Sequence, residues 1–257
     1  MSGPAPEGPT LAGPTLEGLS LDGVAVDYPG RAVLGGVTLR AAPGEVLAVL
    51  GRSGCGKSTL LSVAAGLLPP TRGAVTRPAG RVGFVFQDAR LLPWLTLREN
   101  LRLVAPTLSG AQADDWLARV GLRGRGADRP GQLSLGMAQR AAVARALAVD
   151  PHLLLLDEPA GALDELTAAD LRAELAALLR DRPVTTLLVT HHPLEAALLA
   201  DQVVVLGGRP ATVQGTLRVP GARPRDPDDP AVTSTMRDLR ALVAQADRAA
   251  PGGGEAA

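Results

Sequence analysis

The segment Gly51–Ser58 has the clearest chemistry in the sequence. It reads GRSGCGKS and matches the pattern G-x-x-x-x-G-K-[ST]. Its glycines let the backbone curl so that successive N–H groups point at phosphate oxygens. A helix predicted to begin at Lys57 adds the positive end of its dipole. The apolar run Val46–Leu50 before it and the helix after it favour a phosphate-binding loop over an ordinary glycine-rich turn.

Two residues of this loop have specific predicted roles. We expect Lys57 to reach the β- and γ-phosphates and the Ser58 hydroxyl to ligate Mg²⁺. Lys57 is the only lysine among 26 basic residues, which suggests a site where arginine cannot replace a compact charge on a flexible stem. The other positions expected to line the nucleotide are Gly51, Arg52, Ser53, Gly54, Cys55, Gly56 and Thr59. Cys55, the only cysteine, is interpreted as filling a loop position, because the sequence indicates no redox partner.

Two acids follow a second apolar run, Leu153–Leu156. Asp157, at the tip of a buried strand beside the phosphate loop, is predicted to hold Mg²⁺, usually through water. Glu158 is predicted to polarise the attacking water as general base. His191 follows another apolar run, and at the same sheet edge it would contact the γ-phosphate. From the residues alone, a turn or helix-start histidine is the better interpretation of His191.

Short strands that alternate with helices must position these groups. Strands are predicted at 19–26, 33–40, 46–50, 81–86, 153–156, 186–189 and 203–206, and helices at 57–67, within 91–149, at 166–180 and at 194–200. This alternation predicts a largely parallel sheet covered on both faces. Residues 1–17 and 251–257 are predicted to be tails, Gly221–Pro230 irregular and Ala231–Arg248 a terminal helix.

Composition excludes several classes of protein. The formal net charge is zero, which disfavours nonspecific nucleic-acid binding. One cysteine allows neither a disulfide nor a multi-cysteine metal site within the chain. The apolar runs are shorter than the ~20 residues of a membrane helix, and the N-terminus lacks signal-peptide features. We therefore expect a soluble intracellular protein with a core of Leu, Val and Ala, since aromatic residues make up only 2%.

The order of the motifs resembles the ATP-binding subunits of ABC transporters, from about Leu19 to Pro220. The matching segments are Gly51–Ser58, Gln87, Leu133–Met137 (LSLGM), Leu153–Glu158, Ala162–Asp164 and His191. The resemblance implies an α/β fold: a P-loop NTPase (RecA-like) core, an antiparallel β subdomain and an α-helical signature subdomain at about 91–149. The ATPase domain would span 18–220, with a C-terminal extension at 221–257.

The resemblance also implies site residues. Gln87 looks like the Q-loop glutamine that senses Mg²⁺ and the permease, and it counts among the metal ligands and catalytic residues with Lys57, Glu158 and His191. Ser134 and Gly136 look like the signature motif, and His191 like the switch histidine. Tyr28, the only tyrosine, sits where the family stacks an aromatic ring on adenine; the alternative is a core or edge tyrosine.

ATP and Mg²⁺ are the implied ligands. In this family two subunits pair head-to-tail, so that each ATP lies between one phosphate loop and the partner's signature motif. The implied partners are a second ATPase subunit as a homodimer, a transmembrane permease and, indirectly, an extracytoplasmic substrate-binding protein, with no nucleic acid. The expected location is peripheral, on the cytoplasmic face of the membrane.

A narrower resemblance concerns the transported solute. Gln87–Thr96 (QDARLLPWLT) and Ala222–Pro230 (ARPRDPDDP) are similar to segments of importers for nitrate, sulfonates and taurine. Leu91, Leu92 and Trp94 would then contribute to the surface that receives the permease. The alternative for Leu91 and Leu92 is packing inside the helical lobe.

One residue departs from the family pattern at a position close to the nucleotide. Leu135 stands where the family has glycine, and a leucine side chain must be directed away from phosphate. We expect weakened ATP sandwiching or slower turnover. The alternatives are a regulatory subunit with weak hydrolysis and an exporter ATPase. A DNA-repair or ribosomal ABC protein is disfavoured, because the chain has no sustained heptads and only one phosphate loop.

Overall fold

The computed structural model describes residues 18–249. The predicted tails at 1–17 and 251–257 lie outside these residues. The strands are β1 Leu19–Tyr28, β2 Arg31–Ala41, β3 Val46–Leu50, β4 Arg72–Thr76, β5 Val82–Val85, β6 Leu153–Asp157, β7 Thr185–Thr190, β8 Gln202–Gly207 and β9 Thr212–Arg218. The helices are α1 Lys57–Ala65, α2 Leu97–Val104, α3 Gly110–Arg119, α4 Leu135–Ala148, α5 Glu165–Asp181, α6 Pro193–Leu199 and α7 Pro230–Ala249, with a 3₁₀ turn η1 at Pro130–Gln132.

A six-stranded sheet forms the centre of the molecule, in the order β5-β6-β7-β3-β8-β9. All neighbours are parallel except β9, which runs antiparallel to β8. Side chains of β3 alternate between two cores, because successive residues of a strand point to opposite faces. Val46, Ala48 and Leu50 pack with α4 to α7, whereas Leu47 and Val49 pack with α1 and the smaller sheet. The largely parallel sheet covered on both faces is therefore confirmed.

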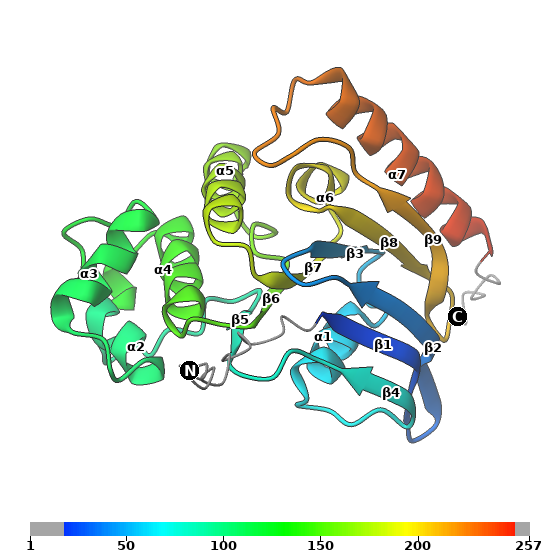
Figure 1. Cartoon of the computed structure of the whole chain (residues 1–257), viewed down its shortest axis with the longest axis horizontal. Helices are drawn as coiled ribbons and strands as arrows, with labels where there is room; N and C mark the ends of the chain where they lie inside the picture. Colours follow the sequence, from blue (N-terminus) through cyan, green and yellow to red (C-terminus); the bar gives the residue numbers. More distant parts are fainter. Residues whose placement is uncertain (1–17, 250–257) are drawn as a thin grey trace, which may run out of the picture.

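The smaller sheet is antiparallel, in the order β2-β1-β4. Helix α1 contacts both this sheet, through β1 and β2, and the large sheet, through β6 and β7. Figure 1 shows α1 between the two sheets and α7 along β9 on the opposite side of the large sheet. The phosphate loop, which immediately precedes α1, therefore lies where the two sheets meet.

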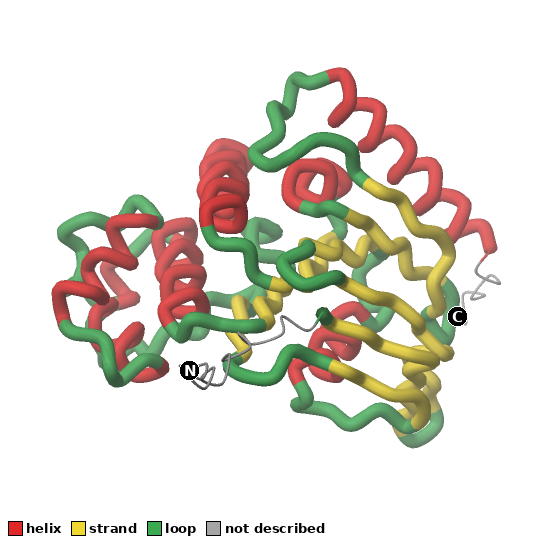
Figure 2. Tube along the Cα trace, viewed as in Figure 1, coloured by secondary structure: helices red, strands yellow, loops and turns green. Residues whose placement is uncertain are grey.

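Helices α2, α3 and α4 form a lobe to one side of the sheets (Figures 1 and 2). Capping boxes start α2, with Thr96 and Glu99, and α3, with Ser109 and Gln112. The chain breaks its helices near Pro106, in the segment 121–126 and at Pro130, as the sequence predicts. This arrangement agrees with the three-part fold implied by the resemblance.

Two strands, β4 and β9, were absent from the sequence prediction. β4 reads RGAVT and most of its residues are exposed, so it has no apolar alternation to detect. β9 reads TVQGTLR, and none of its residues is fully buried. Both form edges of their sheets: β4 pairs with β1, which is distant in sequence, and β9 forms a hairpin with β8, the strand just before it.

The C-terminal extension is fixed to the domain by two arginines. Arg223 Nη1 donates to the Leu199 carbonyl at 2.9 Å and to Asp201 Oδ2 at 2.8 Å. Arg225 Nη1 donates to the carbonyls of Ala197 and Leu198. These bonds satisfy carbonyls at the end of α6 that have no partner within the helix. The segment 221–229 is irregular and leads into the predicted helix, α7, which packs on β8, β9 and α6.

None of the helices within residues 18–249 is both long and apolar enough to cross a membrane.

Candidate functional site

The phosphate loop ends in a helix whose N-terminus is open. Gly56 has φ of 103° and no side chain caps α1, whereas side chains of Thr96, Ser109, Ser134 and Asp164 cap the helices that follow them. The first N–H groups of α1 are therefore available to an external acceptor. An uncapped helix start with positive dipole suits a bound phosphate.

Lys57 is held inside the loop. Its side chain is 5% exposed, and Nζ donates to the carbonyl of Gly51 at 2.9 Å and to that of Arg52 at 3.0 Å. Nζ also lies 3.4 Å from Glu158 Oε1. The ammonium group is thus directed at the point where the phosphate loop meets the end of β6.

Asp157 and Ser58 meet at the same point. The Ser58 hydroxyl hydrogen-bonds the Asp157 carboxyl, and burial raises the pKa of Asp157 despite this bond. A hydroxyl, a carboxylate and the side-chain oxygen of Gln87 are the hard oxygen ligands that Mg²⁺ prefers. No cluster of three His, Cys, Asp or Glu side chains in the described chain would hold a metal alone. These residues therefore fit a Mg²⁺ ion that takes most of its ligands from phosphate and water.

Glu158 occupies a strained backbone conformation, with φ of 46°. Its N–H donates to the Val189 carbonyl at 2.8 Å, which ties the end of β6 to the end of β7. Glu158 Oε2 lies 3.0 Å from His191 Nδ1. The structure therefore brings His191, in the bend before α6, to the carboxylate predicted to be the general base, and its role there stays a prediction.

A cleft of about 710 Å³ lies over these groups, within the usual size of small-molecule sites. It is lined by Tyr28, Pro29, Arg31, Val33, Ser53, Gly54, Gly56, Lys57, Ser58, Thr59, Gln87 and Glu158. Tyr28 is 45% exposed at the rim, so it is not a core residue. Sequence reasoning missed Pro29, Arg31 and Val33; their only signal was proximity in sequence to Tyr28.

Ser134 and Gly136 do not line this cleft within the described chain. Ser134 instead caps α4 by accepting from the Met137 N–H at 3.3 Å. A side chain at Gly136 would collide with Thr167 on α5, so glycine allows the two helix starts to pack closely. Asp164 caps α5 by accepting from the Thr167 N–H at 3.0 Å. Leu135 is 54% exposed at the start of α4.

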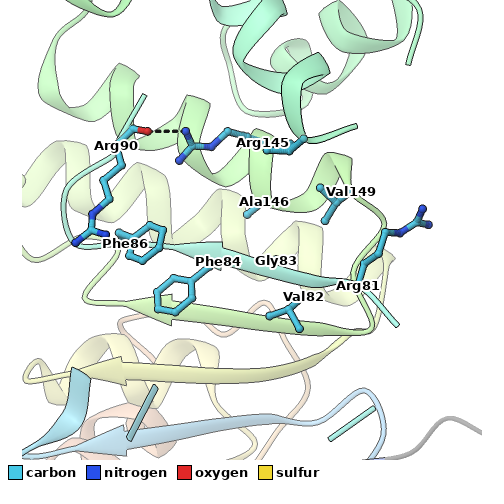
Figure 3. A pocket seen from close by; sticks show the side chains of 10 residues that line it. Arg81, Val82, Gly83, Phe84, Phe86, Arg90, Arg145, Ala146 and Val149 are labelled. Carbon is cyan, nitrogen blue, oxygen red and sulfur yellow. Dashed lines mark hydrogen bonds between the residues drawn. The ribbon is translucent and has the colours of Figure 1, made fainter. Parts of the chain in front are cut away.

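The segment after Gln87 is fastened to α4. Gln139 Nε2 donates to the Phe86 carbonyl at 3.1 Å, and Arg145 donates to the carbonyls of Ala89 and Arg90. Figure 3 shows the Arg145 side chain reaching from α4 to Arg90, with Phe84 and Phe86 along the neighbouring strand. Gln87 therefore immediately follows Phe86, whose carbonyl is hydrogen-bonded to α4, the helix that Ser134 caps.

Cys55 is partly buried and packs against the core around α1. Burial raises the pKa of its thiol, which makes the thiolate scarce at neutral pH. A side chain at Gly51 would meet Cys55 Sγ and the Leu206 carbonyl. These observations favour the interpretation of Cys55 as a loop-filling residue.

Comparison with known proteins gives one family. Residues 34–161 match the family described as ABC transporter. The aliphatic sulfonates import ATP-binding protein SsuB 1 of Pseudomonas aeruginosa is 46% identical over 213 residues, which cover 77% of this chain and 86% of that protein. The corresponding SsuB 2 protein of Burkholderia cenocepacia is 41% identical over 221 residues, 82% of each chain.

Solved structures agree. A dimeric ATP-binding cassette in a post-hydrolysis state, bound to ADP and Pi, aligns with a TM-score of 0.70 at 30% identity over 79% of this chain and 99% of that one. The cbiO1 protein of Clostridium perfringens, part of an ABC transporter complex, aligns with a TM-score of 0.69 at 26% identity over 78% of this chain and 88% of that one. The chain therefore belongs to the ABC transporter family of ATP-binding subunits, whose activity is ATP hydrolysis.

Proposed function

We propose that this chain hydrolyses Mg-ATP to energise an importer of aliphatic sulfonates. The convergence of Lys57, Ser58, Asp157, Glu158 and His191 beside the uncapped start of α1 is the observation that carries the hydrolytic part. The relatives named for aliphatic sulfonate import support the solute class.

Each side chain has one task in this proposal. The loop N–H groups and Lys57 bind the phosphates, and Tyr28 at the cleft rim stacks on the base. Ser58, Asp157 and Gln87 hold Mg²⁺, which when bound neutralises phosphate charge. Glu158 accepts a proton from the attacking water. His191, 3.0 Å from Glu158, orients that carboxylate and the γ-phosphate.

A second copy of the chain would complete the site. Ser134 and Gly136 lie on the helical lobe and outside the cleft that holds Lys57. Ser134 accepts from the Met137 N–H, but the positive end of the α4 dipole still faces outward at this helix start, so it would act on the nucleotide of a partner subunit. The dimeric state of the aligned cassette supports this arrangement.

Substitution of Leu135 tests how closely the start of α4 approaches the partner subunit's nucleotide. Because its side chain is 54% exposed at the start of α4, it would stand between the helix and the partner's nucleotide. We expect Leu135→Gly to raise the rate of ATP hydrolysis about three- to tenfold, the effect of about 1 kcal/mol in the transition state. Leu135→Ala separates side-chain bulk from glycine's backbone freedom. An unchanged rate in both variants would remove Leu135 as the cause of any slow turnover and leave weak hydrolysis unexplained.

The permease is proposed to dock beside the Q-loop segment. Asn100, fully buried, donates to the carbonyls of Leu92, Leu95 and Thr96 and accepts from the Leu92 N–H. These bonds fix a turn that leaves Trp94 67% exposed. Leu91 packs partly against the core, so the alternative of lobe packing holds for it.

A groove of about 580 Å³ adjoins this turn, between β5 and α4. Phe84 and Phe86 stack at 4.0 Å in it, and Arg90 covers the Phe86 ring (Figure 3). Phe84 and Phe86 are half-buried and Val104 at the groove is 43% exposed, so the groove offers partly apolar surface for a protein contact. Docking there would place the chain at the cytoplasmic face of the membrane, with the substrate-binding protein acting on the far side of the permease.

Trp94→Asp should weaken binding to the permease at least about 30-fold, because a buried tryptophan at an interface is worth about 2 kcal/mol or more. The measurement is co-purification with the co-expressed permease, followed by solute uptake. Leu67→Asp is the matched control, since Leu67 is 70% exposed but follows α1. Equal losses in both variants would argue against docking at this turn.

Growth on different sulfur and nitrogen sources tests which solute the proposed importer carries. A strain lacking this chain should fail to grow with an alkanesulfonate as sulfur source and grow normally on sulfate. The native chain should restore growth, and Lys57→Ala should not. Failure only on taurine, or only on nitrate as nitrogen source, would move the proposal to that solute. Normal growth on all of them would favour export.

A further inference from the structure

The last helix, α7, is anchored on the large sheet by one of its faces. Val232, Leu239 and Ala246 are buried, and because each follows the one before by about two helical turns, they lie on the same side of the helix. Helix α7 packs on β8, β9 and α6. A Cβ at Gly215 on β9 would lie 3.1 Å from Leu242, so the strand lets the helix approach closely. The last turn of α7 therefore has a fixed place on the sheet.

This last turn packs against the strand that lies beside the phosphate loop. A Cβ at Gly207, the last residue of β8, would lie 2.9 Å from the Cβ of Ala246. The residue before it, Leu206, is next to the loop, since a Cβ at Gly51 would lie 2.9 Å from the Leu206 carbonyl oxygen. The two glycines allow α7, β8 and the phosphate loop to stack closely. Because a packed interior has few voids, a shift of the last turn of α7 would move the loop.

An ion pair joins the same helical turn to the phosphate loop directly. Arg52 Nε lies 3.8 Å from Asp247 Oδ1. Among the described residues, Arg52 does not line the cleft over Lys57, although the sequence predicts it at the nucleotide. The carbonyl oxygen of Arg52 accepts from Lys57 Nζ at 3.0 Å and from the Cys55 N–H at 3.3 Å. Arg52 therefore connects Asp247 with the ammonium group that is proposed to bind phosphate.

We infer that the last turn of α7 positions the phosphate loop, with Asp247 as a positioning residue that acts on Lys57 through Arg52. The Asp247 carboxylate holds the Arg52 side chain, and the Arg52 backbone holds the Lys57 ammonium group. A loop that is fixed in advance loses less conformational freedom when it binds phosphate, so its affinity is higher. The C-terminal extension would thus set the affinity for ATP, although none of its described residues lines the cleft. This inference rests on the proposed role of Lys57.

Equilibrium binding of ATP to the full chain tests the ion pair. Asp247→Asn should weaken binding by about two- to fivefold, the effect of an exposed ion pair. The KM for ATP should rise by the same factor at unchanged kcat, because the loop binds ground state and transition state alike. Asp247→Glu keeps the charge and should retain the native affinity. The matched control is Asp238→Asn, an exposed carboxylate on the same helix. Equal affinities of Asp247→Asn and this control would overturn the inference.

Two further comparisons separate the ion pair from a general loss of structure. In about 1 M salt the difference between Asp247→Asn and the native chain should vanish, because the screening length falls to about 3 Å. In an Arg52→Gln background, Asp247→Asn should have no further effect, since the two residues act as one pair. A difference that persists at high salt or in this background would refute an action of Asp247 through Arg52.

The packing of α7 on β8 has its own test. Gly207→Ala should displace the last turn of α7 and weaken ATP binding at least about twofold, because overpacking forces neighbours apart. The added carbon would lie 2.9 Å from Ala246, so Ala246→Gly in the same chain should restore the native affinity. Native affinity in Gly207→Ala, or no recovery in the double variant, would refute positioning of the loop through β8.

The reactivity of Lys57 separates this inference from the proposed function. Lys57 is the only lysine, so an amine-reactive reagent reports on it without nucleotide, with the N-terminal amine as internal reference. Asp247→Asn should speed labelling of Lys57 by about two- to fivefold, the weight of an exposed ion pair, and Asp238→Asn should not. Equal labelling of Lys57 in the two variants would overturn the inference. A native chain that binds no ATP but shows this difference would refute the proposed function and leave the link from α7 intact.

Discussion

Glu158→Gln is expected to reduce Mg-ATP hydrolysis at least about 100-fold, the usual contribution of a general base. Glutamine keeps the size of the side chain but cannot take a proton from water. The contacts of Glu158 with Lys57 at 3.4 Å and His191 at 3.0 Å place its carboxylate where the γ-phosphate and the water would meet. The left-handed backbone of Glu158 belongs to an energetically unfavourable conformation that the surrounding fold maintains.

The same variant should accumulate as an ATP-bound dimer. In the proposed dimer, ATP binding would close the two subunits and hydrolysis would release them, so a chain that binds ATP without hydrolysing it should stay closed. Gel filtration in Mg-ATP measures this, with the native chain and Asp115→Asn, an exposed α3 residue, as controls. A Glu158→Gln variant with more than a tenth of the native rate would show that another group activates the water. A native chain that dimerises without hydrolysing ATP would favour the regulatory alternative or a need for the permease.

Lys57→Ala should weaken ATP binding by about 10- to 100-fold, because a hydrogen bond to a charged group contributes about 1.5–3 kcal/mol. Lys57→Arg should weaken ATP binding as well. The ammonium is buried and lies between two loop carbonyls, and a planar guanidinium does not fit a site built for a point charge. Equilibrium binding of ATP measures both, with Arg240→Ala on the exposed face of α7 as the control.

The single lysine allows an independent check of this prediction. An amine-reactive reagent can modify only Lys57 and the N-terminal amine. Bound ATP should protect Lys57, and mass spectrometry of the digested chain would measure the protection. Labelling of Lys57 at the same rate with and without ATP would contradict contact between Lys57 and the phosphates.

Much of the fold and of the candidate site could be predicted from residues that are adjacent in the sequence. The phosphate loop, the acids after β6 and the helix start at Lys57 are contiguous, so their chemistry depends on neighbours a few residues away. The buried strands β3, β6 and β7 are runs of apolar residues, which periodicity detects. The resemblance to ABC subunits added Gln87, Ser134, Gly136 and Tyr28, whose roles remain predictions.

The tertiary structure decided what depends on residues distant in sequence. β4 exists because β1, distant in sequence, supplies its hydrogen bonds, and its own side chains carry almost no pattern. His191 gained its significance from a contact with Glu158, 33 residues away. Glu195 on α6 and Arg172 on α5 are charged residues on helices, and only the packing of these helices buries them. The burial of a side chain and the charges around it depend on residues from all parts of the fold, so no local pattern in the sequence predicts them.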